Sequence, residues 1–198
     1  MRNELAICSL LLSLLSVQTV RADQITYDVT LTGPGEAPPN ASPGTGFAVI
    51  TIDTTANTLN IVSDTFSGLL GTTTASHIQC CTALPGVGTA GAATQTPSFS
   101  GFPLGVTSGS YSMLFDMTQA STWDPSFITA NGGTAAGAEA ALAAGAAAGD
   151  AYLNIHTTVF PGGEIRGFLV PAPEPGTLLL LGTGLLGFAG AARRKWFA

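Results

Sequence analysis

Basic residues are almost absent from the middle of this 198-residue sequence. Between Asp23 and Val170, ten acidic residues stand against Arg166 alone, so this stretch has a formal charge of −9, which the whole-chain value of −6 conceals. Phosphate binding needs clustered lysine and arginine. The stretch is therefore excluded as a nucleic-acid-binding domain, and its charge repels anionic lipid while it attracts divalent cations.

Cysteine is equally scarce, with three residues in the chain. Cys8 lies in the apolar N-terminal run, which leaves the neighbours Cys80 and Cys81. A long-range disulfide is therefore excluded. A bond between adjacent cysteines works at a Cα separation near ~3.8 Å across a trans peptide, below the usual range of about 4.4–6.8 Å. The sequence leaves the redox state of this pair open.

The common catalytic motifs are also missing. The chain contains no G-x-S-x-G, no H-E-x-x-H, no glycine-rich phosphate loop and no D-x-D-x-D-G calcium loop. Glycoside hydrolysis requires a pair of carboxylates, and nothing in the spacing of the ten acids singles out two. We therefore predict that the protein is not an enzyme.

The N-terminus has the plan of a secretory signal peptide. Arg2 precedes the apolar run 5–17, and small residues stand at the minus-three and minus-one positions of a cleavage site after Ala22. The apolar run is too short for a spanning helix, which needs about 20 residues. We predict that residues 1–22 are removed and that the mature chain begins at Asp23.

The C-terminus predicts a marginal transmembrane helix. Residues 177–192 are uncharged, and at ~1.5 Å per residue they reach roughly 24 Å, against a hydrocarbon core of about 30 Å. The basic tail 193–198 that follows favours a cytoplasmic end, which places everything before Pro171 outside.

Alternating or β-branched runs predict the strands of one domain over residues 23–170. The predicted strands are Gln24–Leu31, Phe47–Ile52, Leu59–Phe66, Ala75–Gln79, Ser110–Met117, Tyr152–His156 and Glu164–Val170. Asp124 followed by Pro125 predicts the start of a short helix, and Thr134 predicts a cap for an alanine-rich helix over Ala135–Ala148. We predict an all-β, Greek-key, immunoglobulin-like β-sandwich with a short helical insertion before the last hairpin.

Two histidines and two cysteines form the candidate metal set. His77 and His156 lie on separate predicted strands, and Cys80 or Cys81 would complete a tetrahedral site for zinc or copper. The H-x-x-C-C spacing is no recognised zinc signature. In the alternative, each histidine hydrogen-bonds a backbone group or a carboxylate to hold a loop, and the protein has no resident cofactor.

Glu164 and Arg166 share one face of the last predicted strand because they are two residues apart. A catalytic pair would need an oriented nucleophile beside it. We instead predict a structural clamp, in which the planar guanidinium of Arg166 binds a carboxylate or a loop carbonyl.

Three segments make the chain resemble the CHRD domain of chordin and of bacterial exported proteins: LTGPGEAPPNASPGTGFAVI, SHIQCCTALPG and AYLNIHTTVFPGGEIRGFL. The resemblance spans Gln24 to Leu169. It implies the fold and an exported location more than it implies a chemical activity. Members of this family often carry His-Ile-His where this chain has His77-Ile78-Gln79, and the change weakens any metal site.

The tail from 171 to 198 resembles a PEP-CTERM sorting signal, with a proline-flanked glutamate in the segment 171–176, then the membrane segment, then the basic stop. The alternative is an ordinary tail anchor behind a proline hinge. The resemblance implies processing by an exosortase in a Gram-negative bacterium that makes exopolysaccharide. The residues involved are Pro173, Glu174, Pro175, Arg193, Arg194 and Lys195.

The two resemblances together predict an exported binding or structural module. The tail would hold the protein transiently in the membrane, and an exosortase would release it to the cell surface or the extracellular matrix of a biofilm. Exopolysaccharide or other envelope components are the expected partners. The alternative function is an exported metal-dependent redox or hydrolytic protein that uses His77 and His156.

Overall fold

The computed structural model describes residues 24–173 and 183–184. The elements are β1 (Gln24–Thr32), β2 (Thr45–Asp53), β3 (Thr58–Ser67), β4 (Thr73–Gln79), β5 (Gly109–Asp116), a 3-10 turn (Ala120–Thr122), α2 (Pro125–Ala130), α3 (Ala135–Ala148), β6 (Tyr152–Thr157), β7 (Ile165–Phe168) and β8 (Val170–Pro171). Every predicted strand and both helices predicted within residues 23–170 are present, which confirms the all-β class. The last predicted strand is divided into β7 and β8.

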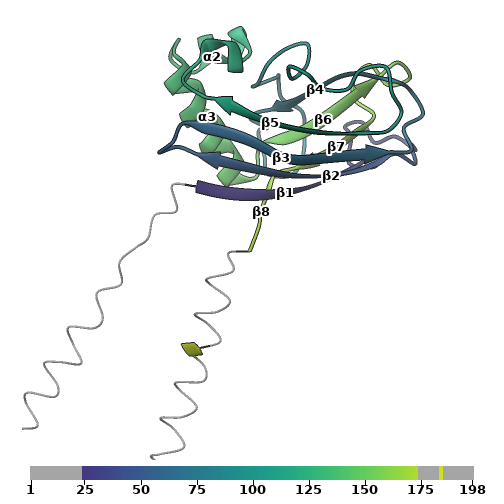
Figure 1. Cartoon of the computed structure of the whole chain (residues 1–198), viewed down its shortest axis with the longest axis horizontal. Helices are drawn as coiled ribbons and strands as arrows, with labels where there is room; N and C mark the ends of the chain where they lie inside the picture. Colours follow the sequence, from purple (N-terminus) through teal and green to yellow (C-terminus); the bar gives the residue numbers. More distant parts are fainter. Residues whose placement is uncertain (1–23, 174–182, 185–198) are drawn as a thin grey trace, which may run out of the picture.

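The strands form one connected antiparallel sheet with the order β4-β6-β7-β1-β2-β3-β5, and β8 pairs with β1. One residue pair, Thr32 with Arg166, links β1 to β7, whereas β1 and β2 pair along nine positions. The pairing of β1 with β7 and β8 therefore joins the group β4-β6-β7 to the group β1-β2-β3-β5, which lies in front of it in Figure 1. A division into the two separate sheets of a sandwich is not confirmed.

One hydrophobic core contains side chains from both strand groups. The first group contributes Ile78, Leu153 and Ile155, and the second contributes Ile50 and Ile61, all of them fully buried. Each lies on the inward face that the two-residue side-chain period of a strand produces. Curling the sheet over this core brings the two groups together.

The long connection between β4 and β5 packs onto the sheet instead of leaving it. Phe99 and Phe102 are buried, and their rings contact the buried ring of Tyr111 on β5. The backbone N–H of Phe99 also donates to Ser76 on β4 at 2.9 Å. A loop of this length is uncommon unless it is packed or functional, and here it covers one end of the core.

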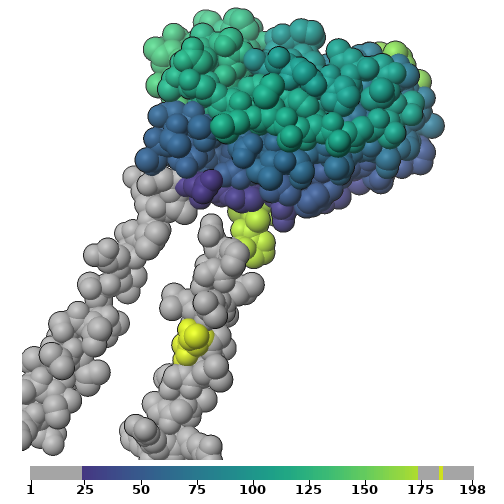
Figure 2. Space-filling view, viewed as in Figure 1, coloured from purple at the N-terminus to yellow at the C-terminus, as the bar shows by residue number. Residues whose placement is uncertain are grey.

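Capping side chains set both helices where the sequence predicts them. The Asp124 carboxylate accepts hydrogen bonds from the backbone N–H of Ser126 and Phe127, and α2 then starts at Pro125. Thr134 caps α3 in the same way, and Gly149 ends it in the left-handed conformation. Figures 1 and 2 show the two helices together at one end of the domain.

Gly145 explains how an alanine-rich helix docks on the domain. A Cβ atom at this position would collide with the sulfur atoms of both Cys80 and Cys81. The neighbouring Leu142 and Ala146 are fully buried. The glycine lowers intrinsic helix stability by about 1 kcal/mol, but it allows α3 to approach the end of β4 closely.

The first and last described strands are neighbours, since Tyr27 and Asp28 pair with β8. Figure 2 shows β8 beside β1 on one side of the body. In the described part of the chain, no helix has both the length and the hydropathy to span a membrane. The predicted signal peptide 1–22 and all of the predicted transmembrane segment 177–192 except residues 183–184 lie outside the described residues, and both stay predictions.

Candidate functional site

Glu164 lies immediately before the closing strand β7 and is completely buried, with 0% of its surface exposed. Its carboxylate accepts hydrogen bonds from the hydroxyls of Ser42 and Thr157, each at 2.6 Å, and from the backbone N–H groups of Leu70 at 2.6 Å and Gly71 at 3.1 Å. Burial raises the pKa of Glu164, but these four hydrogen bonds outweigh burial and leave the pKa lowered. The ionised side chain therefore joins three separate segments of the chain.

Arg166 points its guanidinium at two loops. Its Nε donates to the carbonyl oxygen of Gly35 at 2.5 Å, and one terminal nitrogen donates to the carbonyl oxygen of Gly88 at 2.8 Å. The guanidinium carbon also lies 4.6 Å from the ring centroid of Tyr152 and 5.4 Å from that of Phe168. The contacts predicted for a loop clamp are present, and whether they stabilise the fold stays a prediction.

Glu36 and Asn154 complete this buried polar cluster, and sequence reasoning did not select either of them. The Asn154 amide donates to both Glu36 carboxylate oxygens at 3.1 and 3.3 Å, while Arg166 Nε lies 3.9 Å from one of them. Burial raises the pKa of Glu36 to about 7 although Arg166 and a backbone hydrogen bond lower it. The sequence feature that could have indicated Glu36 is its position as a charged residue inside the Pro-Gly-rich segment GPGEAPP.

The two histidines lie side by side on the paired strands β4 and β6. The ring centroids of His77 and His156 are 4.8 Å apart. His77 Nδ1 bonds the carbonyl oxygen of Pro97 at 3.2 Å, and His156 Nδ1 bonds that of Pro161 at 2.8 Å. The sequence-predicted histidine pair is therefore brought together, and each ring also holds a loop.

Cys80 and Cys81 form a disulfide with each other. Both sulfur atoms lie against Gly145 of α3, so neither is a free thiolate. Within the described residues, no three His, Cys, Asp or Glu side chains are grouped as a metal site would require. The four-residue set considered from the sequence is therefore divided into a histidine pair and a disulfide.

Asp64 on β3 is a second buried carboxylate that sequence reasoning did not select. It is 1% exposed, and neither carboxylate oxygen has a hydrogen-bond partner. Burial raises its pKa to about 7. Its cross-strand partner on β5 is Tyr111, whose pKa is raised to about 12 by burial and by the Asp64 charge.

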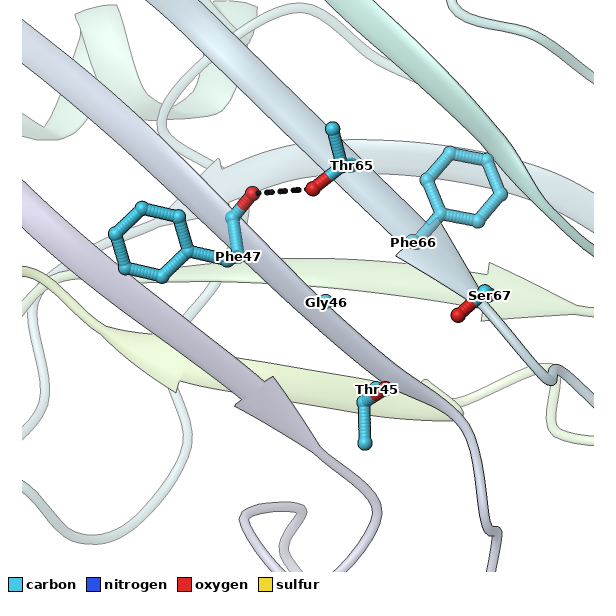
Figure 3. Close-up of a pocket in the computed structure, with 6 residues that line it drawn as sticks. All are labelled: Thr45, Gly46, Phe47, Thr65, Phe66 and Ser67. Atoms are coloured by element: carbon cyan, nitrogen blue, oxygen red, sulfur yellow. Dashed lines mark hydrogen bonds between the residues drawn. The ribbon is translucent and has the colours of Figure 1, made fainter.

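The outer face of β1, β2, β3 and β5 carries two rows of uncharged side chains, which we call the hydroxyl face. The strand register places these residues side by side: Thr30, Phe47, Thr65 and Ser110 in one row, and Thr32, Thr45 and Ser67 in the next. Phe47 is 44% exposed. It lines a pocket of about 330 Å³ with residues that include Thr45 and Thr65 (Figure 3). The sequence signal was the period-two pattern of β2, which places Phe47 on the face opposite the buried Ala48 and Ile50.

The sorting residues are almost entirely outside the described part of the chain. Pro173 is described and exposed. Ala22, Asp23, Glu174, Pro175, Arg193, Arg194 and Lys195 are outside it.

Comparison with family models identifies both the folded domain and the C-terminal tail. The CHRD domain model matches residues 27–169, and the PEP-CTERM protein-sorting motif matches residues 171–195. No curated protein and no solved structure matches the chain. The sorting motif implies processing by an exosortase, a membrane enzyme, and export to the cell surface or the extracellular space. Since the first match covers well over half of the sequence, the chain belongs to the CHRD domain family.

Proposed function

We propose that this protein is a non-catalytic surface module whose hydroxyl face binds a neutral polysaccharide of the envelope or extracellular matrix. The signal peptide directs export, the C-terminal segment holds the protein in the membrane until processing, and cleavage near Pro173 releases the CHRD domain. The observation that carries the proposal is the uncharged, hydroxyl-lined surface around Phe47.

The composition of the hydroxyl face suits a sugar polymer. Threonine and serine hydroxyls both donate and accept hydrogen bonds, as sugar hydroxyls do. Phe47 adds an exposed aromatic ring, an apolar surface on which the C–H face of a sugar ring can pack. Thr65 is the cross-strand neighbour of Phe47 on β3, and Thr45 lies two residues before Phe47 on β2 (Figure 3), so polar and apolar groups line the same pocket.

Charge favours a neutral polymer over an anionic one. The stretch 23–170 has a formal charge of −9, and its single basic residue, Arg166, is buried. An acidic polysaccharide would meet repulsion with no exposed cation to offset it. The two rows of the hydroxyl face contain no acidic residue, and a neutral chain meets no such penalty there.

The buried ionisable residues have structural roles in this proposal. Glu164 and Arg166 fix the loops that follow β1, β3 and β4 to the closing strands. We also propose that the two strand groups act as the layers of a sandwich, with the hydroxyl face on the outside of one layer.

Affinity electrophoresis of the purified protein through gels containing soluble neutral glucans tests the proposal. We expect the wild type to be retarded and Phe47→Ala to lose at least about two-thirds of the retardation, because aromatic anchors dominate such surfaces. Leu84→Ala is the matched control, since Leu84 is 64% exposed and lies outside the hydroxyl face. Equal retardation of the wild type and Phe47→Ala would contradict the assignment.

A further inference from the structure

A second pocket lies beside the Phe47 pocket on the outer side of β3 and β5. It has a volume of about 240 Å³, and we call it the bulge pocket. Thr65 lines both pockets. The two are therefore contiguous, and one extended molecule can occupy both. The lining of the bulge pocket includes Val62, Ser63 and Thr65 on β3, and Ser110 and Ser112 on β5.

A β-bulge in β3 produces the bulge pocket. Ile61 and Ser63 pair with neighbouring residues of β2, and Val62 between them has no partner on β2. The pairing of β3 with β5 shifts over the same residues. A bulge re-aims side chains, and bulges are common beside functional sites. Here the extra residue leaves the Val62 side chain 48% exposed, although Ile61 before it is fully buried.

The bulge pocket offers hydrogen-bonding groups without an exposed charge. In the described part of the chain, the hydroxyls of Ser63, Ser110 and Ser112 bond to no other protein group. Asp64 also contributes to the lining, but both oxygens of its carboxylate are buried. Each free serine hydroxyl can donate and accept a hydrogen bond. A neutral sugar can therefore bond to these hydroxyls without meeting a charged group in the pocket.

We propose that the bulge pocket is a second sugar subsite, and that one neutral polysaccharide chain lies across β3 from the Phe47 ring to Val62. The inference rests on the proposed function, because it extends the same binding surface. Thr65, the cross-strand partner of Phe47, precedes no charged residue on this path and lies three positions from Val62, a separation of at most about 10 Å at roughly 3.3 Å per residue. Two linked sugar rings have this length. Val62 gives the second ring an apolar surface, as Phe47 does for the first.

Competition by short oligosaccharides in affinity electrophoresis tests the second subsite on the full-length protein. The gels contain laminarin or hydroxyethyl cellulose, and the competitor is the monosaccharide, disaccharide or trisaccharide of the same linkage. For the wild type, we expect the competitor concentration that halves the retardation to fall at least about fivefold from the monosaccharide to the disaccharide, because the second ring fills the bulge pocket. Val62→Ala should lose most of this gain, and Ser112→Ala should weaken disaccharide binding about threefold.

Val87→Ala is the matched control, because Val87 is 53% exposed and lies in the loop after β4. It should keep both the retardation and the gain from the second ring. If Val62→Ala kept the whole gain while Phe47→Ala lost its retardation, the second subsite would be wrong and the proposed function would stand. A wild-type protein that neither glucan retards would contradict both.

Discussion

Two buried carboxylates in different regions of the sheet behave in opposite ways. Glu164, at the closing strand β7, is 0% exposed and accepts four hydrogen bonds, whereas Asp64, on β3, is 1% exposed and accepts none. The pKa of Glu164 is lowered, and that of Asp64 is raised to about 7. The pKa values of these two solvent-inaccessible carboxylates therefore shift in opposite directions, because four hydrogen-bond donors surround Glu164 and none reaches Asp64.

The difference follows from what meets each side chain. Glu164 lies where the loop after β1 and the loop after β3 return to the sheet, and both supply hydrogen-bond donors. Asp64 lies in the region between β3 and β5 where the register shifts, and it faces the apolar core on the same strand face as Ile61 and Phe66. We therefore expect the ionised Glu164 to stabilise the folded state, and the ionised Asp64 to destabilise it.

Glu164→Gln should cause the largest loss of stability. A glutamine amide cannot accept all four hydrogen bonds, and its NH₂ group faces donors, so buried donors lose their partner at about 1–3 kcal/mol each. We expect the free energy of unfolding, measured by urea denaturation, to fall by about 3–5 kcal/mol. Ser42→Ala removes one of the four donors and should lower it by about 1 kcal/mol. If the free energy of unfolding of Glu164→Gln fell by less than about 1 kcal/mol, Glu164 would not stabilise the fold, and its contrast with Asp64 would be wrong.

Arg166→Ala should have the next largest effect. It removes the hydrogen bonds to Gly35 and Gly88 and leaves Glu36 buried without its cation. Hydrogen bonds from charged groups contribute about 1.5–3 kcal/mol each. We therefore expect the free energy of unfolding, measured by thermal denaturation, to fall by about 2–4 kcal/mol. Arg166→Lys should recover part of this loss. An unchanged melting temperature together with abolished ligand binding would show that Arg166 belongs to a binding site.

Asp64→Asn should have a smaller, pH-dependent effect of the opposite sign. Because folding raises the Asp64 pKa to about 7, its contribution to stability is greatest below the unfolded value near 4 and is lost as pH rises to 7. The variant should therefore be more stable than the wild type at pH 8, by about 1–3 kcal/mol, and should match it near pH 4. A difference that does not change between pH 4 and pH 8 would show that Asp64 is not protonated in the folded protein.

The sequence predicts the secondary structure well because local signals specify it. The alternation of β1, the Asp124-Pro125 helix start and the Thr134 cap each depend on neighbouring residues, and each is confirmed. The strand order was not predictable in this way. The pairs that join the closing strands to β1, which are Thr32 with Arg166 and Tyr27 and Asp28 with β8, connect positions far apart in the sequence.

The candidate site was predictable only where a residue type is rare. Arg166 and the two histidines stand out because the exported stretch has so few basic residues and histidines. Glu36 and Asp64 do not stand out among ten acids, because their burial and their partners depend on contacts between distant segments. The state of Cys80 and Cys81 could not be derived from spacing alone, and the structure pairs them.

Intact mass spectrometry of protein recovered from the native cell surface tests the central claim most directly, namely that an exported CHRD domain is released from its two extensions. We expect a species that begins at Asp23, ends between Pro173 and Pro175, and lacks two hydrogen atoms because of the Cys80–Cys81 disulfide. Recovery of the full 198-residue chain, with its N-terminal and C-terminal segments intact, would contradict this account.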